Sequence, residues 1–204
     1  MSGFGQLMMR KKSEPVEYIT LTKVGSPTIS NNIVSNFYTS RYLKISSGIS
    51  FSINFEMVFK FMVTSAVNNN ALFNFGGVSG DEATVRLTAQ FTSSLAIWCC
   101  FRYNGTNDQL SIETTTNKVT LNQWYYIKYK YSNSTIEMYL SANGTTWELL
   151  GSKSATINSL TFPDCVIGNR TLSTERYFRG SIDLSPGASY LRIDNQKYIY
   201  SLPQ

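Results

Sequence analysis

Apolar residues recur at every second position along much of the chain, which is the pattern of a strand with one buried face. The clearest run is Phe51–Val63, in which seven apolar side chains fall on one face. A helix would scatter these side chains around its circumference, so we predict one long strand there. The same alternation predicts further strands within Ala71–Phe75, Val85–Phe91, Leu95–Tyr103, Leu110–Ile112, Tyr125–Tyr131 and Ile136–Leu140.

Turn-forming residues lie between these runs. Asn104-Gly105 and Asn143-Gly144 are dipeptides that favour tight hairpins, and Ser132-Asn133-Ser134 separates two alternating runs. No segment of ten or more residues shows a 3.6-residue period. The pattern therefore predicts an all-β, antiparallel fold, with two sheets packed as a jelly-roll sandwich over residues 18–204.

The first 17 residues differ from the rest of the chain. An apolar stretch is followed by a basic triplet and then by Pro15. Because the charge follows the apolar part, we expect no signal peptide. A docking arm for a partner protein is one interpretation, and a frayed chain end is the other. The residues expected to contact the partner are Phe4, Leu7, Met8, Met9, Arg10, Lys11 and Lys12.

Composition excludes several classes of function. The chain has no histidine, so it has no Ser-His-Asp site, no Cys-His site and no HExxH zinc site. Cys99, Cys100 and Cys165 have neither zinc-ligand spacing nor the even number of a disulfide framework. The net charge of +5 is scattered without a basic stripe, and no apolar run approaches 18 residues. We therefore expect neither nucleic acid nor a membrane as a partner.

The C-terminal half contains a recognisable order of motifs. These are Leu121–Tyr131 with its tryptophan, Ile136–Leu140, Asn143-Gly144, Val166-Ile167-Gly168 and Phe178–Leu184. The order resembles the concanavalin A-like, laminin-G-like jelly-roll superfamily over about Phe51–Tyr200. The glycines then have scaffold roles. Gly180 is expected to let the chain turn sharply into a closing strand, and Gly168 to allow close packing at a strand end.

The segment Gly180–Ser201 resembles the ending of jelly-roll domains in phage virion and tail proteins. Asn195-Gln196-Lys197 stands where those domains have an Asp-Gly-Lys turn. Together with the arm, this resemblance implies a non-enzymatic phage structural protein: a capsid decoration, head-fibre or tail-associated domain. Such a protein is made in the host cytoplasm, becomes part of the virion, contacts other capsid proteins and forms a homo-oligomer.

The alternative is a lectin-like module for host or environmental glycans, since carbohydrate binding is common in this superfamily. Sugar binding needs an aromatic ring beside amide or carboxylate groups. One candidate cluster is Trp98, Arg102, Tyr103, Asn104 and Asp108. The other is Trp147, which follows Asn143 in a turn. Core packing of these aromatic residues is the competing explanation.

Catalysis and metal binding receive less support. Jelly-roll glucanases carry a Glu-x-Asp-x-Glu strand, and the thirteen acidic residues here form no such triplet. We therefore expect no enzyme activity, no catalytic residue and no cofactor. The one candidate metal is calcium, held by loop residues Asp81, Glu82 and Asp108, and solvated loop carboxylates are the alternative.

Overall fold

The computed structural model describes residues 16–51, 54–76, 86–102, 109–115, 117–154, 156–157, 160–170 and 176–203. These ranges contain strands and turns and no helix, and most strand pairs are antiparallel, so the predicted all-β class is confirmed. In this part of the chain there is accordingly no helix that could cross a membrane. The division into an arm of residues 1–17 and a domain from residue 18 stays a prediction, although β1 already begins at Val16.

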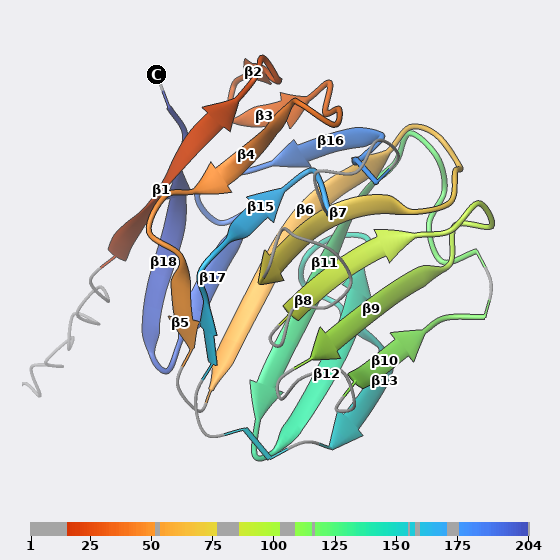
Figure 1. The fold of residues 1–204 in the computed structure, drawn as a ribbon. Coiled ribbons are helices and arrows are strands. Elements are labelled where there is room, and N and C mark those ends of the chain that lie inside the picture. Colours follow the sequence, from red (N-terminus) through yellow and green to blue (C-terminus); the bar gives the residue numbers. More distant parts are fainter. Residues whose placement is uncertain are drawn as a thin grey trace, which may run out of the picture.

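Most strands follow one another in a continuous hydrogen-bonded order, which passes from one layer to the other at β1. Figure 1 shows the two layers, one in front of the other. The first layer contains, in order, β13 (Glu148–Ser154), β12 (Thr135–Ser141), β11 (Trp124–Ser132), β6 (Phe55–Val63), β17 (Tyr190–Ile193), β18 (Gln196–Ser201) and β1 (Val16–Val24). The second layer continues from β1 through β4 (Tyr42–Ile45), β15 (Cys165–Ile167), β7 (Asn70–Gly76), β8 (Arg86–Phe91), β9 (Ile97–Arg102) and β10 (Gln109–Glu113). Five short strands lie beside these: β2 (Thr28–Ser30), β3 (Ile33–Ser35), β16 (Gly180–Asp183), β5 (Ile49–Phe51) and β14 (Leu160–Phe162).

Strand β1 belongs to both layers. Its first half, Val16–Thr20, pairs in parallel with β18, and its second half, Leu21–Val24, pairs antiparallel with β4. The parallel pair departs from the purely antiparallel prediction. Alternation reports which face of a strand is buried but not which strand lies beside it or in which direction.

Aromatic rings from the two layers meet in the core. Phe59 of the first layer lies 5.2 Å from Phe73 of the second, measured between ring centroids, and Phe61 lies 5.0 Å from Phe91. Tyr129 contacts Phe73 edge-on at 5.5 Å. Each fully buried ring removes a large apolar area from water and contributes about 2–3 kcal/mol. The inward-facing alternating positions therefore supply most of the driving force for folding.

The predicted continuous strand over Phe51–Val63 is wrong at its start. Strand β5 ends at Phe51 and pairs with β14, whereas β6 begins at Phe55 and pairs with β11 and β17. The Phe51 and Phe55 rings nevertheless stack 4.4 Å apart in the same core. Because both segments bury the same alternating face, a period-two pattern cannot reveal the break between them.

Two glycines are required by close packing. A Cβ at Gly168, where φ is +84°, would lie 2.0 Å from the Phe37 ring, which agrees with the predicted close approach. A Cβ at Gly180 would lie 2.1 Å from the backbone oxygen of Met62. Gly180 is thus explained by the contact between β16 and β6, and it has no left-handed φ.

The predicted tight hairpins have different outcomes. Asn143-Gly144 does lie between two strands, but in a six-residue connection from β12 to β13 and not in a tight two-residue turn. Asn133 and Ser134, between β11 and β12, have φ values of 50° and 56°, as a two-residue type I′ turn requires. Between β17 and β18 the turn is Asp194-Asn195, with φ 51° at Asp194. It lies one position before the Asn195–Lys197 segment that the resemblance had indicated, since Gln196 and Lys197 already belong to β18. The predicted Asn104-Gly105 turn lies outside the described residues.

All three cysteines are free and buried. Cys99 packs in the core, and Cys100 on the opposite face accepts a hydrogen bond from Arg86 at 3.6 Å. Burial raises the pKa of Cys99 well above its usual value and that of Cys165 to about 12. We expect the folded protein to resist Ellman's reagent at pH 8 and all three thiols to react after denaturation. Rapid labelling of the folded protein would contradict this packing.

Candidate functional site

The loop between β12 and β13 is held by its own hydrogen bonds. Asn143 Oδ1 accepts from the backbone N–H groups of Thr145 and Thr146, each at 2.9 Å. Ser141 Oγ accepts from the backbone N–H of Asn143 at 3.2 Å. Asparagine and serine favour such local side-chain-to-backbone bonds, so this short polar sequence stabilises one loop conformation.

This loop places Trp147 on the outer face of the first layer. Gly144 has a φ of +77°, and a Cβ there would lie 3.1 Å from the Tyr126 ring. The Trp147 ring meets the Tyr126 ring edge-on, with centroids 6.5 Å apart. The Lys128 ammonium lies 4.1 Å from the Trp147 ring centre and 4.7 Å from that of Tyr139. These aromatic and cation–π contacts fix the position of the indole.

An open hollow of about 360 Å³ adjoins the tryptophan. Five of its lining residues bear the groups that could bind a ligand, and we call them the Trp147 site: Lys118, Asn143, Thr146, Trp147 and Glu148. The Lys118 ammonium and the Glu148 carboxylate are 2.6 Å apart, and their side chains remain 31% and 56% exposed. An aromatic surface beside amide, hydroxyl, carboxylate and ammonium groups can bind a ring that carries several hydroxyls.

Glu148 lies opposite the core residue Leu140, so the Lys118–Glu148 pair lies at the inward-facing side of this layer. A second ion pair lies on the outer face of the same layer. Lys60 Nζ donates to Asp183 Oδ2 at 2.9 Å and lies 5.1 Å from the centre of the Trp124 ring. The hydrogen bond to Asp183 raises the pKa of Lys60. Burial acts to raise the pKa of Asp183, but hydrogen bonds from Ser185 and Lys60 outweigh it and lower that pKa. Burial lowers the pKa of Lys128.

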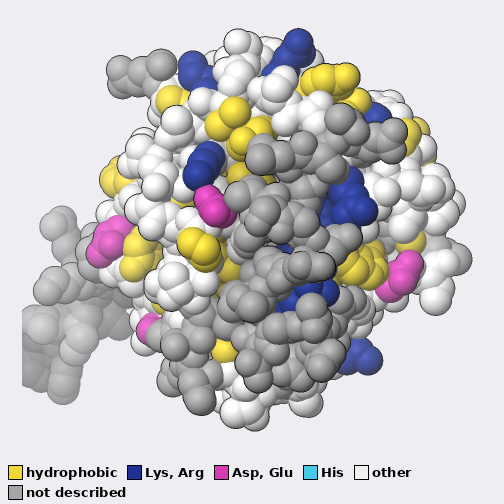
Figure 2. Space-filling model, in the orientation of Figure 1, with side chains coloured by type: hydrophobic (Ala, Val, Ile, Leu, Met, Phe, Trp, Pro, Cys, Tyr) yellow, Lys and Arg dark blue, Asp and Glu magenta, His cyan; other side chains and the backbone are white. Residues whose placement is uncertain are grey.

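The other predicted cluster lies on the outer face of the second layer. Trp98 is partly exposed there, and the Arg170 guanidinium lies 5.3 Å from its ring centre. Arg170 also donates to Gln90 Oε1 at 2.9 Å. Arg102 is only 7% exposed and faces Arg86 across the β8–β9 pair. In Figure 2, Lys and Arg side chains occur at several separate places on the face that the second layer turns to the viewer.

The structure therefore separates the two predicted clusters onto opposite outer faces. Trp98 and Arg102 share one face, and Trp147 lies on the other. Tyr103, Asn104 and Asp108 lie outside the described residues, as do the arm residues and the predicted calcium ligands. Within the described ranges no three His, Cys, Asp or Glu side chains group as metal ligands would, so calcium stays a prediction.

Four residues around Trp147 were not singled out as candidates from the sequence: Tyr126, Lys128, Lys118 and Glu148. The sequence contains a signal for Tyr126 and its neighbour Lys128. An outward-facing strand position is normally polar. The outward positions Trp124, Tyr126 and Lys128 instead place two aromatic rings next to a lysine. No sequence signal connects Lys118 with Glu148, since they are 30 positions apart and only the folded chain brings them together.

Comparison with known proteins gives similarity in fold and not in sequence. No protein-family model matches the chain, and no curated protein matches it. Domain 4 of AbnA, an extracellular arabinanase from Geobacillus stearothermophilus solved with arabinotriose, superposes with a TM-score of 0.56 at 12% identity. That match covers 80% of this chain and 78% of the other.

Two further structures are similar. The CBM40 of the Ruminococcus gnavus IT-sialidase, solved with α2,3-sialyllactose, has a TM-score of 0.51 at 14% identity and covers 70% of this chain and 86% of the other. A heptameric SAP-like pentraxin from Limulus polyphemus has a TM-score of 0.53 at 13% identity, with coverages of 84% and 74%. These matches show a concanavalin A-like jelly-roll fold, as the motif order had predicted.

The Lys60–Asp183 pair predicts a pH-dependent contribution to stability. Asp183 has a lowered pKa, so its contribution is present above about pH 4 and is lost as the pH falls through that pKa. Lys60 has a raised pKa, so its contribution is present below about pH 10 and is lost at higher pH. We expect Asp183→Asn to lower the free energy of unfolding by about 1–3 kcal/mol at pH 7, measured by urea denaturation.

The more exposed pair Lys44–Asp164 supplies the matched control. Asp164→Asn is expected to lower the free energy of unfolding at pH 7 by less than about 1 kcal/mol. The loss of unfolding free energy caused by Asp183→Asn is expected to become smaller below about pH 4. If this loss stayed constant down to pH 2, the charge of Asp183 would not be its cause.

Proposed function

We propose that this chain is a non-catalytic carbohydrate-binding domain, a two-sheet jelly-roll sandwich that holds a sugar ring against Trp147. The observation that carries the proposal is the Trp147 site itself. There a partly exposed indole, fixed by Tyr126 and Lys128, adjoins a hollow with a carboxylate, an ammonium and an amide.

The rigidity of the site favours binding. Asn143 holds the loop, and the contacts of Trp147 with Tyr126 and Lys128 hold the ring before any ligand arrives. Little side-chain entropy remains to be lost, so more of the stacking energy contributes to affinity. Sugar hydroxyls can donate to Glu148 and accept from Lys118, because both side chains remain accessible to solvent.

The fold comparison supports the proposal without carrying it. Two of the similar structures were solved with arabinotriose and with sialyllactose, so this fold can present a sugar-binding surface. A fold hosts many functions, however, and the argument for this chain rests on its own residues. The choice of sugar depends on the residues of the Trp147 site, and it is determined by measuring binding to this chain and not from the ligands of the similar structures.

The phage structural role remains a separate prediction. None of the three compared structures is described as a virion protein. Homo-oligomerisation, capsid partners and a place in the virion likewise stay predictions. The two roles are compatible, since a binding domain can be displayed on a particle.

Replacing one tryptophan at a time tests the proposal. The full-length protein is first screened on a broad glycan array that includes arabinans and sialylated glycans. Trp147→Ala is then expected to weaken binding to the selected glycan at least tenfold in isothermal titration calorimetry, or about 1.4 kcal/mol. Trp98→Ala is the matched control, because this tryptophan is also partly exposed but lies on the opposite outer face.

Thermal unfolding of both variants separates loss of the site from loss of the fold. If Trp98→Ala abolished binding while Trp147→Ala left it intact, the site would lie on the second layer and the assignment to Trp147 would be wrong. An array that stays blank for the folded wild-type protein would refute the function.

A further inference from the structure

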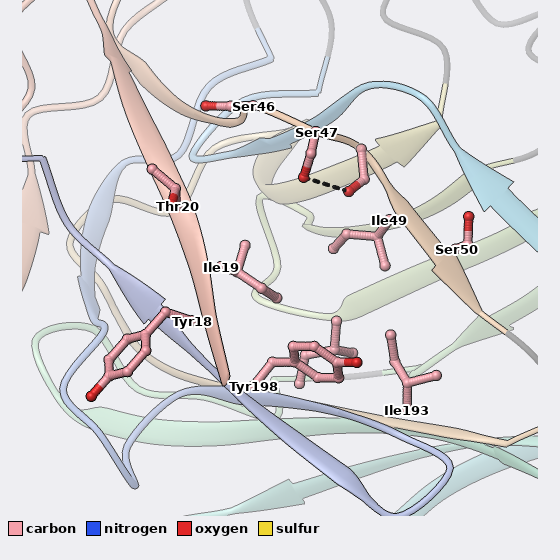
Figure 3. A pocket seen from close by; sticks show the side chains of 11 residues that line it. Tyr18, Ile19, Thr20, Ser46, Ser47, Ile49, Ser50, Ile193 and Tyr198 are labelled. Carbon is pink, nitrogen blue, oxygen red and sulfur yellow. Dashed lines mark hydrogen bonds between the residues drawn. The ribbon is translucent and has the colours of Figure 1, made fainter. Parts of the chain in front are cut away.

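Two other pockets of the domain lie away from the Trp147 site, and they differ in charge. One, of about 430 Å³, lies where β1 passes between the layers, and none of the described residues that line it is charged (Figure 3). The other, of about 450 Å³, lies where β3 and β6 end and β16 begins. Tyr38, Tyr177 and Arg179 line this second pocket, and none of its described lining residues is acidic. We call it the tyrosine–arginine pocket.

Two neighbouring Phe and Tyr residues on each of two segments bring the tyrosines of this pocket together. Phe37 and Phe178 are buried, with ring centroids 6.1 Å apart. Their sequence neighbours Tyr38 and Tyr177 lie further out, and those two ring centroids are 4.8 Å apart. Consecutive residues of an extended chain point to opposite sides. The contact between the phenylalanines in the core therefore also holds the tyrosine pair in place.

Buried asparagines hold the two segments. The turn from Tyr38 to Arg41 is closed by two backbone hydrogen bonds, of 2.9 and 3.0 Å, and Asn169 Nδ2 donates to two backbone oxygens of this turn. On the other segment, Asn70 Oδ1 accepts from the backbone N–H of Arg179 at 2.7 Å. Both asparagines are almost completely buried. The pocket is thus formed before a ligand arrives, and little entropy is lost on binding.

Two guanidinium groups lie against the tyrosine pair. The Arg179 guanidinium is 4.4 Å from the centre of the Tyr177 ring, and it donates to the hydroxyl of that tyrosine at 3.1 Å. The Arg41 guanidinium is 5.8 Å from the centre of the Tyr38 ring, and it donates to Asn36 Oδ1 at 3.1 Å. No carboxylate among the described residues pairs with either arginine.

These guanidiniums have donors left for an anion. A guanidinium carries five N–H donors, and each of the two arginines uses one on a described side chain. Arginine binds carboxylate and sulfate-like groups through two parallel hydrogen bonds, which are stronger than bonds between neutral groups. A negatively charged group on a ligand is therefore the natural partner of this pocket.

The remaining lining suits a ring that carries hydroxyls. Tyr38 is 48% exposed, so much of its side chain is accessible to a ligand. Four hydroxyl side chains also line the pocket, and each can donate or accept a hydrogen bond: Ser35, Thr64, Ser65 and Ser181. An aromatic surface, several hydroxyls and a positive charge are then combined in a space large enough for a sugar ring.

We propose that the tyrosine–arginine pocket is a second saccharide site, selective for a sugar unit that carries a carboxylate or a sulfate ester. The ring of that unit packs on Tyr38, and Arg179 and Arg41 bind its charged group. This site shares no lining residue with the Trp147 site, so its existence does not depend on the function proposed there.

Matched charged and neutral saccharides test the selectivity of the full-length protein in isothermal titration calorimetry. The pairs are sialyllactose and lactose, sulfated lactose and lactose, and trigalacturonate and its methyl ester. We expect at least one charged member to bind at least about tenfold more tightly than its neutral partner. The first and third pairs test a carboxylate, and the second tests a sulfate ester. If no charged member bound to the folded wild type, the proposal would be wrong.

Single substitutions locate the binding. Arg179→Gln and Arg41→Gln, which change different segments, are each expected to reduce the preference for the charged saccharide at least about tenfold. Lys153→Gln is the matched control, because it removes the same charge from an exposed position on β13 that lines neither pocket. For the ring contact, Tyr38→Ala is compared with Tyr18→Ala, since Tyr18 is also exposed but lines the uncharged pocket. Thermal unfolding confirms that each variant is folded.

Two results would overturn the proposal although a charged saccharide binds. If Trp147→Ala abolished that binding while Arg179→Gln and Arg41→Gln retained it, the acidic sugar would bind at the Trp147 site. If inorganic sulfate competed as well as the saccharide at equal concentration, the pocket would bind anions and not sugars. Failure of the proposed function is instead detected by unchanged glycan binding in Trp147→Ala, so the two failures are distinguished by different variants.

Discussion

Strand β1 hydrogen-bonds to β18 with its first half and to β4 with its second half, and the rest of the structure depends on that exchange of partners. One strand that serves both ladders joins the layers at one edge and sets how their faces meet. Between the two layers that it joins, the aromatic rings of β6, β7, β8 and β11 pack against each other. The same exchange leaves a pocket where β4 and β18 part.

The two outer faces have different chemistry, although both belong to strands with the same alternating pattern. On the first layer, rings and ammonium groups alternate, and the loop before β13 adds Trp147 to them. On the second layer, Arg86 and Arg102 oppose each other and are nearly buried. A rigid ring beside accessible polar groups suits a hydroxyl-rich ligand, and Trp147 with Asn143, Thr146 and Glu148 forms such an arrangement at the first layer.

Most of the strands could be predicted from the sequence because burial on one face imposes a period of two. The Asn133-Ser134 turn could be predicted as well, because few residues tolerate two successive left-handed conformations. The break between Phe51 and Phe55 could not, since both phenylalanines face the same core. Trp147 was a candidate from its turn, but Lys118 and Glu148 meet only after β10–β13 are in place.

The sequence by itself determined the class of secondary structure, the positions of many inward-facing side chains and several of the turns. These three features depend on interactions between residues that are close together in the sequence, so the local sequence pattern is enough to predict them. The tertiary structure alone decided which strands pair, that β1 and β18 run in parallel, and that Trp98 and Trp147 face opposite directions. Pairing joins residues as far apart as Val16 and Lys197, and the free energy of such contacts depends on the whole packed core and not on any local pattern.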